Sequence, residues 1–260
     1  MGILNVTPDS FSDGGRFVTP EHAIGRGLEL VEEGADVVDV GGESTRPGAS
    51  PVPVGVERTR VEAVITELIR LRPEAMLSVD TAKAEVAAAA LASGVAIVND
   101  ISAGSDPAMF ATVARHGAGI VLMHMRGEPR TMQRDTSYAH VVADVHSFLA
   151  GRAAAALAAG IPRRRIFLDP GIGFGKDGVG NLRLLAALPD LASLGYAVVV
   201  GVSRKSFIGT LTGADTGARL AGSLAAIADT VGTPRVIVRV HDVRATVEFL
   251  TVLSALRGAA

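Results

Sequence analysis

The chain has 260 residues, 48% of them hydrophobic, a length that suits one α/β barrel of about 250 residues with a large core. Its net charge of −2 gives no electrostatic reason to expect a nucleic acid or a membrane as partner. The absence of cysteine excludes disulfides, thiolate catalysis and thiolate metal sites. No apolar run approaches the roughly 18 residues of a membrane span, and the chain opens on a strand, so we expect a cytoplasmic protein.

Short apolar runs alternate with helix-like stretches along the whole chain. The runs are rich in Val, Ile and Leu with little strict alternation, as expected for parallel strands covered by helices. The predicted strands are 2–5, 36–40, 76–80, 96–100, 120–123, 166–169, 197–201 and 236–240. The predicted helices are 20–33, 55–71, 82–93, 107–116, 139–159, 180–192, 218–230 and 243–256. This repeat, without a linker, predicts the α/β class and a (β/α)8 TIM barrel with residues 1–260 as a single domain.

Each predicted strand ends in polar residues, and in a parallel barrel these ends converge on the face that carries the chemistry. Asp80, Asn99 and Asp169 end three different strands, and Asp100 is a further candidate for the same layer. Buried carboxylates need donors as partners, which an aminopyrimidinone ring offers along one edge. Lys205 can supply a donor to a ring carbonyl or nitrogen. The alternative is that these groups only pair with one another and brace the barrel, but three polar strand ends on one face favour a ligand.

Cationic side chains form a second cluster after the last two strands. Arg239 and His241 close the eighth strand, Arg204 and Lys205 follow the seventh, and Arg46 lies in a Gly/Pro-rich loop. Loops after strands seven and eight are the common phosphate site of such barrels, and arginine binds phosphate oxygens with two parallel N–H groups. The cluster therefore predicts phosphate binding. The alternative for Arg204 and Arg239 is a surface ion pair.

Three long loops follow predicted strands, at 7–15, 43–49 and 126–138. Long loops in a compact domain are usually lids or binding loops, so we expect a site that closes over its substrate. Asn5 and the acidic first loop predict a Mg²⁺ site that bridges phosphates, because magnesium takes few protein oxygens and keeps its waters.

The segment 169–176, with sequence DPGIGFGK, ends like a phosphate-binding P-loop but has proline at the first glycine position and lacks the final Ser/Thr. A tight turn that lays Phe174 along a flat ligand is the better interpretation. Lys205 could form a Schiff base, although nothing else favours an aldolase. His124 indicates a core histidine, and no His/Asp/Glu spacing predicts zinc.

The longer motifs are similar to those of the dihydropteroate synthase family, in order from residue 1 to the final helix. They are MGILNVTPDSFSDGG at 1–15, GGESTRPG at 41–48, DPGIGFGK at 169–176 and SRKSFIG at 203–209, with VDT at 79–81, ND at 99–100 and RVHD at 239–242. The resemblance implies a pterin-binding barrel of folate biosynthesis that uses Mg²⁺. It implies that 6-hydroxymethyl-7,8-dihydropterin pyrophosphate and p-aminobenzoate give 7,8-dihydropteroate and pyrophosphate.

The resemblance also implies roles for individual residues. The pterin site is expected to contain Asp80, Asn99, Met123, Asp169, Phe174 and Lys205. The p-aminobenzoate site is expected to contain Thr45, Arg46, Pro47, Phe174 and Ser206. Pyrophosphate is expected at Asn5, Arg46, Arg239 and His241, with Asn5 also serving the Mg²⁺. Because pyrophosphate leaves before the amine attacks a pterin methylene cation, charge stabilisation should matter most, and the expected catalytic residues are Asp80, Lys205, Arg239 and His241.

Two other functions stay open at this level. A pterin-binding methyltransferase, which moves a methyl group from a folate to a corrinoid protein, would share the layer of Asp80, Asn99 and Asp169 but leaves the cationic cluster unexplained. A paralogue that binds pterin without turnover needs no pyrophosphate site. The resemblance alone implies a homodimer and a p-aminobenzoate site at which sulfonamides compete.

Overall fold

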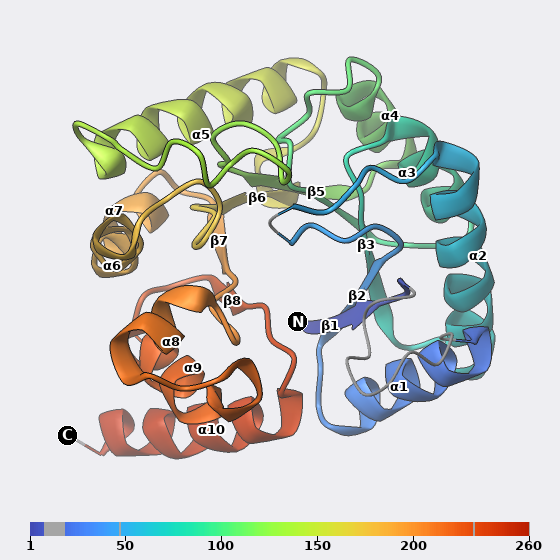
Figure 1. The fold of residues 1–260 in the computed structure, drawn as a ribbon. Coiled ribbons are helices and arrows are strands. Elements are labelled where there is room, and N and C mark those ends of the chain that lie inside the picture. The colour runs from blue at the N-terminus through green and yellow to red at the C-terminus, as the bar shows by residue number, and fades with distance from the viewer. Residues whose placement is uncertain (8–18, 47, 231, 260) are drawn as a thin grey trace.

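The computed structural model describes residues 1–7, 19–46, 48–230 and 232–259 (Figure 1). Eight parallel strands form one sheet in which each strand pairs with the next in the chain. The strands are β1 (Gly2–Asn5), β2 (Val37–Gly41), β3 (Met76–Asp80), β4 (Ile97–Asp100), β5 (Gly119–Met123), β6 (Ile166–Asp169), β7 (Ala197–Val200) and β8 (Val236–Val238). A parallel bridge between Gly2 and Val240 closes the sheet, and the N–H of Ile3 donates to the carbonyl of Val240 at 2.9 Å. The predicted TIM barrel is confirmed.

The helices surround the strands in chain order, as Figure 1 shows from α1 to α10. They are α1 (Pro20–Glu32), α2 (Val54–Leu71), α3 (Ala84–Ala92), α4 (Met109–His116), α5 (Val141–Ala158), α6 (Gly178–Ala186), α7 (Leu188–Ala192), α8 (Ser206–Thr212), α9 (Leu220–Ile227) and α10 (Val243–Gly258). Short 3₁₀ turns lie at η1 (Arg163–Arg165), η2 (Thr216–Ala218) and η3 (Ala228–Thr230). Every predicted strand and most predicted helices begin and end close to the observed ones.

The helix predicted at 180–192 is wrong in outline, because the structure has α6 and α7 with a break at Ala187. Pro189 lies in the first turn of α7. Proline is tolerated in that turn, where its missing N–H has no helical partner, but it disrupts the interior of a continuous helix.

The region after β7 also differs from the prediction. The segment expected as a loop contains α8, which begins directly after Lys205 and ends at Gly213 in the left-handed conformation (φ 73°). The helix predicted at 218–230 is α9 with a 3₁₀ turn on each side. Lys205 is therefore the last residue of the loop after β7, directly before α8.

Two layers of side chains fill the barrel. An apolar layer near the amino ends of the strands consists of Met1, Val37, Ile97, Val121 and Val199, with Phe167 and Ile237 packed against it. Alternate residues of a strand share a face, so the residue two positions further along each strand also points inward. On five strands these residues are Asp39, Asn99, Met123, Asp169 and Arg239. The apolar layer therefore closes one end, and a mostly polar layer forms the floor of the other.

Helix α5 is long and apolar enough, by length and composition, to cross a membrane, contrary to the expectation that no apolar run has that length. Its buried residues are Val141, Val145, Leu149, Ala153 and Ala156, a stripe at helical spacing. The helix packs against β5 and β6. It is one of the helices that cover the barrel.

The apolar layer should contribute strongly to stability. Val121→Ala removes two methyl groups from a fully buried position, and we expect the free energy of unfolding to fall by about 2 kcal/mol. Val179→Ala, at a residue that is 56% exposed on α6, is the matched control and should change it by less than about 0.5 kcal/mol. Urea unfolding measures both, and equal effects would contradict a packed layer.

Candidate active site

Asp39 is the centre of a buried hydrogen-bond network on the inner face of the barrel. Its side chain is fully buried and accepts hydrogen bonds from Ser78 Oγ at 2.6 Å, Asn99 Nδ2 at 2.9 Å and Arg239 Nε at 2.6 Å. These partners come from β3, from β4 and from the residue after β8. Asp39 is not among the residues predicted from the sequence. The available signal was a carboxylate at an inward position of an apolar strand, which needs buried donors.

Arg239 joins two strand ends through its guanidinium group. Its Nε donates to Asp39, and its Nη2 donates to Asp80 Oδ2 at 2.8 Å. Burial raises the pKa of Asp80 to about 7, and the nearby Arg239 opposes this shift. Arg239 is thus in an ion pair, as the alternative interpretation held, but a buried one within the site.

Asp169 and Lys205 form the second charged pair of the polar layer. Asp169, at the end of β6, is buried and accepts a hydrogen bond from the Gly171 N–H at 2.7 Å. Burial raises the pKa of Asp169, whereas that N–H and the charge of Lys205 lower it. Burial also lowers the pKa of Lys205, to about 8. The ammonium of Lys205 lies 4.0 Å from the centre of the Phe174 ring, so the cation and the ring share one wall of the site.

Asn99 and Met123 also belong to this layer, whereas Asp100 does not. Asn99 and Met123 are buried, and Met123 is in register with Asp169. The carboxylate of Asp100 accepts from the N–H and Oγ of Ser102 and from the N–H of Gly104. Asp100 therefore braces the loop after β4, because it follows Asn99 directly and points to the opposite face of the strand.

His241 and Arg204 differ in what they offer a ligand. The His241 Nδ1 atom lies 3.0 Å from Ser203 Oγ. Burial and the neighbouring Arg204 and Arg239 lower the pKa of His241 to about 4, so its ring is neutral at pH 7. Arg204 pairs with Asp242 through two N–H groups, Nε at 3.1 Å and Nη2 at 2.5 Å. For Arg204 the ion-pair interpretation is therefore correct.

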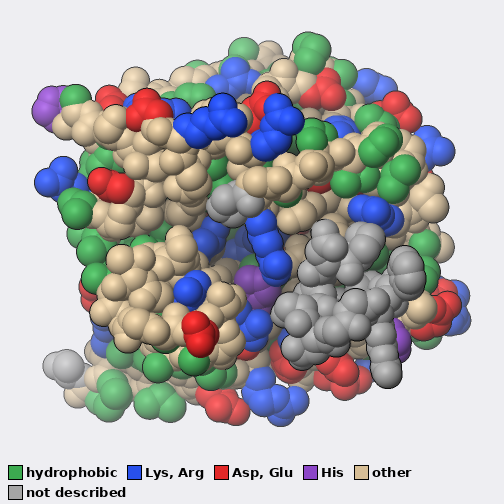
Figure 2. Space-filling model, viewed as in Figure 1, with side chains coloured by type: hydrophobic (Ala, Val, Ile, Leu, Met, Phe, Trp, Pro, Cys, Tyr) green, Lys and Arg blue, Asp and Glu red, His purple; other side chains and the backbone are tan. Residues whose placement is uncertain are grey.

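The loops that follow the strands meet above the polar layer. The N–H of Gly48, after β2, donates to the carbonyl of Pro129, after β5, at 3.3 Å. Gln133 Nε2 donates to the carbonyl of Gly173, after β6, at 3.1 Å. Figure 2 shows a hollow at the centre of this face, with Lys, Arg and His side chains around it. The structure thus brings together three loops that the sequence marked as long or glycine-rich.

The residues expected around p-aminobenzoate lie on or beside these loops. Thr45 is half-buried, and Arg46 is exposed. Pro47 lies outside the described residues. Ser206 is exposed at the first position of α8. Phe174 contacts Lys205, so it is the member of this set that the structure links directly to the polar layer.

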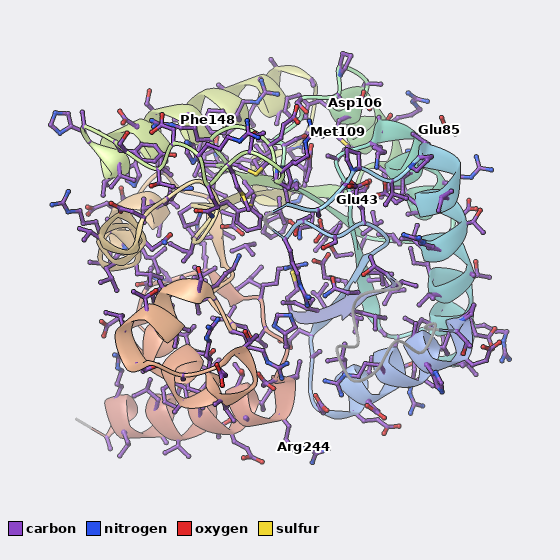
Figure 3. The ribbon with its side chains drawn as sticks, in the orientation of Figure 1. Glu43, Glu85, Asp106, Met109, Phe148 and Arg244 are labelled. Carbon is purple, nitrogen blue, oxygen red and sulfur yellow. The ribbon has the colours of Figure 1, made fainter. Side chains whose placement is uncertain are left out.

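A half-buried lysine fixes the base of the loop after β2. The Lys83 ammonium contacts the carboxylates of Glu43 and Glu57, and Glu43 also accepts from the N–H of Val52 at 3.2 Å. Thr81 Oγ1 donates to Glu57 at 2.6 Å. Figure 3 shows Glu43 inside the ring of helices, whereas Glu85 lies at its outer side. The two ends of this loop are therefore held together by charge.

The side-chain oxygens of Asn5 and Asp80 both lie beside Gly41. Gly41, on the strand between theirs, has no side chain, and a Cβ there would lie 3.6 Å from Asn5 Oδ1 and 3.7 Å from Asp80 Oδ2. Amide and carboxylate oxygens are ligands that Mg²⁺ prefers, and it needs few of them from a protein. Among the described residues, no group of three or more His, Cys, Asp or Glu side chains could hold a metal ion.

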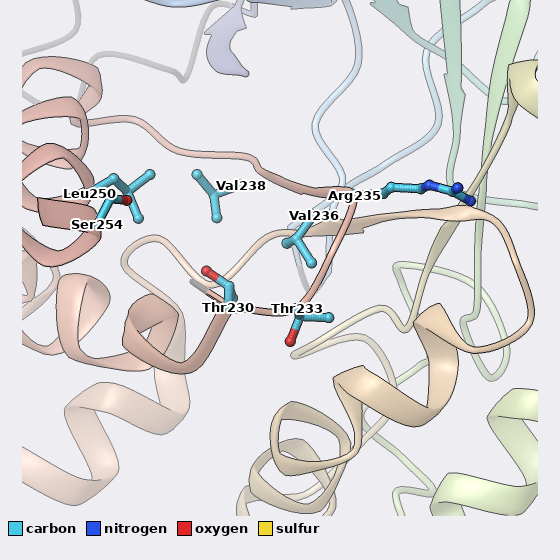
Figure 4. A pocket seen from close by; sticks show the side chains of 8 residues that line it. Thr230, Thr233, Arg235, Val236, Val238, Leu250 and Ser254 are labelled. Atoms are coloured by element: carbon cyan, nitrogen blue, oxygen red, sulfur yellow. The ribbon is translucent and has the colours of Figure 1, made fainter. Parts of the chain in front are cut away.

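A cavity of about 280 Å³ lies elsewhere, between β8 and α10 (Figure 4). Its lining includes Thr230, Thr233 and Arg235, which precede β8 in the chain. Arg239 and His241 follow β8, so the cavity lies at the opposite end of that strand. We do not assign it to the polar layer.

Known proteins are similar to this chain over nearly its whole length. Residues 1–241 match the family described as pterin binding enzyme. The dihydropteroate synthase of Escherichia coli K12 is 43% identical over 259 residues, which are 100% of this chain and 92% of that protein. The one from Neisseria meningitidis serogroup C is 46% identical over 261 residues, 98% of this chain and 92% of that protein. The structure of Xanthomonas albilineans dihydropteroate synthase with 4-aminobenzoic acid is similar with a TM-score of 0.91 at 49% identity, covering 98% of this chain and 92% of that one. The chain belongs to the dihydropteroate synthase family of pterin-binding barrel enzymes.

Proposed function

We propose that this protein joins 6-hydroxymethyl-7,8-dihydropterin pyrophosphate to p-aminobenzoate, releasing 7,8-dihydropteroate and pyrophosphate. The observation that carries the proposal is the single polar layer that places Asp80, Asn99, Asp169 and Lys205 beside Arg239 and His241. The family supports it, as does the Xanthomonas albilineans enzyme, whose structures include complexes with 4-aminobenzoic acid and with 7,8-dihydropteroate.

The polar layer suits the pterin ring. Asp80 and Asp169 are acceptors for N–H groups of an aminopyrimidinone, and Asn99 has an oxygen and a second N–H beyond the one that Asp39 uses. Lys205 donates to a ring carbonyl or nitrogen. Met123 and Phe174 supply apolar contact for the ring faces. Asp39 positions two of these groups, because it fixes both the Asn99 amide and the Arg239 guanidinium.

Arg239, His241, Arg46 and Asn5 serve the pyrophosphate in this proposal. Arg239 donates to the two aspartates through Nε and Nη2, so the N–H groups of Nη1 are available to a phosphate oxygen. The neutral His241 ring binds by a hydrogen bond rather than by charge. Asn5 would hold Mg²⁺ through its amide oxygen, and a bound Mg²⁺ would add positive charge to the leaving pyrophosphate.

Chemistry then follows from charge separation. The bond between the pterin methylene carbon and the pyrophosphate oxygen breaks, and pyrophosphate keeps the electron pair. The p-aminobenzoate nitrogen attacks the cationic methylene carbon, forms the C–N bond and then loses a proton. Asp80 stabilises the cation, while Arg239 and His241 stabilise the separating anion. Thr45, Arg46, Pro47, Phe174 and Ser206 are the proposed walls of the p-aminobenzoate site.

We also propose a cytoplasmic homodimer that sulfonamides inhibit. Exposed apolar residues on α8 and α10, including Leu211, Val252 and Leu256, support a subunit contact. A sulfonamide complex is known for the similar Yersinia pestis dihydropteroate synthase, whose structure has a TM-score of 0.93 at 39% identity. The similarity covers 99% of this chain and 93% of that enzyme, so it includes the whole barrel. This supports inhibition of the present protein at the proposed p-aminobenzoate site.

The direct test is turnover by the purified protein with Mg²⁺, dihydropterin pyrophosphate and p-aminobenzoate. We expect dihydropteroate and pyrophosphate in equal amounts, with product formation dependent on the amine. Chromatography of the pterin products and a phosphate-release assay measure the two. Tight binding of the pterin pyrophosphate without any product would instead identify a pterin-binding paralogue.

The pH dependence should report the buried carboxylate of Asp80. Its pKa is raised to about 7, and the ionised form is the one that stabilises the cation, so kcat at saturating substrate should rise as the pH increases through about 7. Loss of the Lys205 proton, whose pKa is lowered to about 8, should reduce kcat/KM at higher pH. Asp80→Asn should lower kcat/KM by about 10²–10³ and abolish the rise through pH 7. A variant that keeps this rise would show that another group titrates.

The Mg²⁺ requirement should depend on Asn5. Asn5→Ala should raise the Mg²⁺ concentration for half-maximal turnover by about tenfold, because one protein oxygen is lost while substrate and water oxygens remain. Titration of Mg²⁺ into chelator-treated enzyme measures this. Saturating Mg²⁺ should restore much of the turnover, and an unchanged titration curve would place the metal elsewhere.

A further inference from the structure

Lys176 is a buried cation whose hydrogen bonds all go to the main chain. It is 3% exposed and ends the DPGIGFGK segment. Its Nζ donates to the carbonyls of Phe174 at 2.8 Å, Gly171 at 2.9 Å and His124 at 3.1 Å. An ammonium group has three N–H donors, so these three carbonyls use all of them. The group therefore has no N–H left for a substrate.

The three carbonyls belong to two strand ends. His124 follows β5, whereas Gly171 and Phe174 lie in the turn after β6. The two segments are in close contact, since a Cβ on Gly171 (φ 68°) would lie 1.9 Å from the His124 carbonyl oxygen. Lys176 thus joins the turn after β6 to the end of β5 where no side chain could fit between them.

The conformation of this turn decides where two proposed substrate contacts lie. The Phe174 ring faces the Lys205 ammonium at 4.0 Å. A Cβ on Gly173 (φ 83°) would lie 3.1 Å from Lys205 Cδ, so the turn also packs against the stem of Lys205. A shift of the turn would therefore move the ring and the lysine together.

We propose that Lys176 is a positioning residue for the pterin site, whose ammonium group holds the turn 171–174 against the end of β5 and so sets the Phe174 ring beside Lys205. This inference rests on the proposed function, because the pterin substrate is what the pair receives. Lys176 itself touches neither the substrate nor the reacting atoms. A displacement of about 1 Å at such a site can cost about 10² in rate.

The charge on Lys176 is sensitive to pH near neutrality. Burial lowers the pKa of Lys176 to about 7, Lys205 and Arg126 lower it as well, and Asp169 raises it. His124 stays neutral, because burial lowers its pKa to about 3. A neutral amine has only two N–H donors and cannot serve three carbonyls. The full set of hydrogen bonds is therefore present below pH 7 and is lost as the pH rises through that value.

The test compares Lys176→Met with wild type at several pH values. At pH 6 we expect kcat/KM for dihydropterin pyrophosphate to be lower in the variant by about 10², mostly through KM. At pH 8.5 the ratio of wild type to variant should shrink to below about 10, because wild type has then lost the ammonium too. Asp80 titrates in both proteins, so its effect cancels in this ratio. Calorimetric Kd values for the same compound provide a readout that is independent of turnover.

Arg152→Met is the matched control. Arg152 also donates to two loop carbonyls, those of Ala103 at 2.6 Å and Gly104 at 2.8 Å, but it holds the loop after β4. The Arg152→Met variant should unfold at a lower urea concentration than wild type, without a pH-dependent change in KM. The proposal is overturned if Lys176→Met has the wild-type KM. It is also overturned if the variant's loss of kcat/KM is the same at every pH and matches that of Arg152→Met. In either case, turnover by the wild-type protein would leave the proposed function intact. A wild-type protein that neither binds nor converts the pterin pyrophosphate overturns both.

Discussion

The guanidinium group of Arg239 lies between the carboxylates of Asp39 and Asp80, and the arrangement of the strand ends depends on it. Removing ions from water is costly, so a buried ion pair is tolerated only when its remaining hydrogen bonds are satisfied. Asp39 meets this condition with Ser78 and Asn99, which connects β2, β3 and β4 to the end of β8. The residues that face a ligand are thus held by one network before the ligand arrives. Such preorganisation is what stabilisation of a charge-separated transition state requires.

The apolar layer below this network makes the two ends of the barrel interior different. Val121, Val199 and their neighbours occupy the interior near the amino ends of the strands, so a ligand reaches the polar layer only from the loop side. On that side the loops after β2, β5 and β6 contact one another, and Lys83 and Lys176 hold two of them at their bases. The layer, the ion pairs and the loop anchors together define one hollow with a rigid floor and a rim of separate segments.

The sequence predicted much of this arrangement, because chemistry at strand ends leaves a local pattern. Asp80, Asn99, Asp169 and Lys205 stand where apolar runs stop, and the structure brings them into one layer. Other features depend on partners that no local pattern identifies. Asp39 binds Arg239, which is 200 positions away in the sequence. Arg204, after β7, is paired with Asp242, after β8. Lys176 binds backbone oxygens, which every residue carries, so its role becomes visible only when the turn is folded.

The near absence of lysine has a practical consequence. The chain has 22 arginines but only three lysines, and each of these lies at a different strand-end loop: Lys83 by the loop after β2, Lys176 after β6 and Lys205 after β7. None is a freely exposed surface group, since Lys83 and Lys205 are half-buried and Lys176 is buried. Isotopically labelled lysine, incorporated during protein synthesis, would therefore give one set of side-chain signals for each loop and leave the amines unmodified. The protein carries its own sparse set of reporters around the hollow, with almost no background from the rest of its surface.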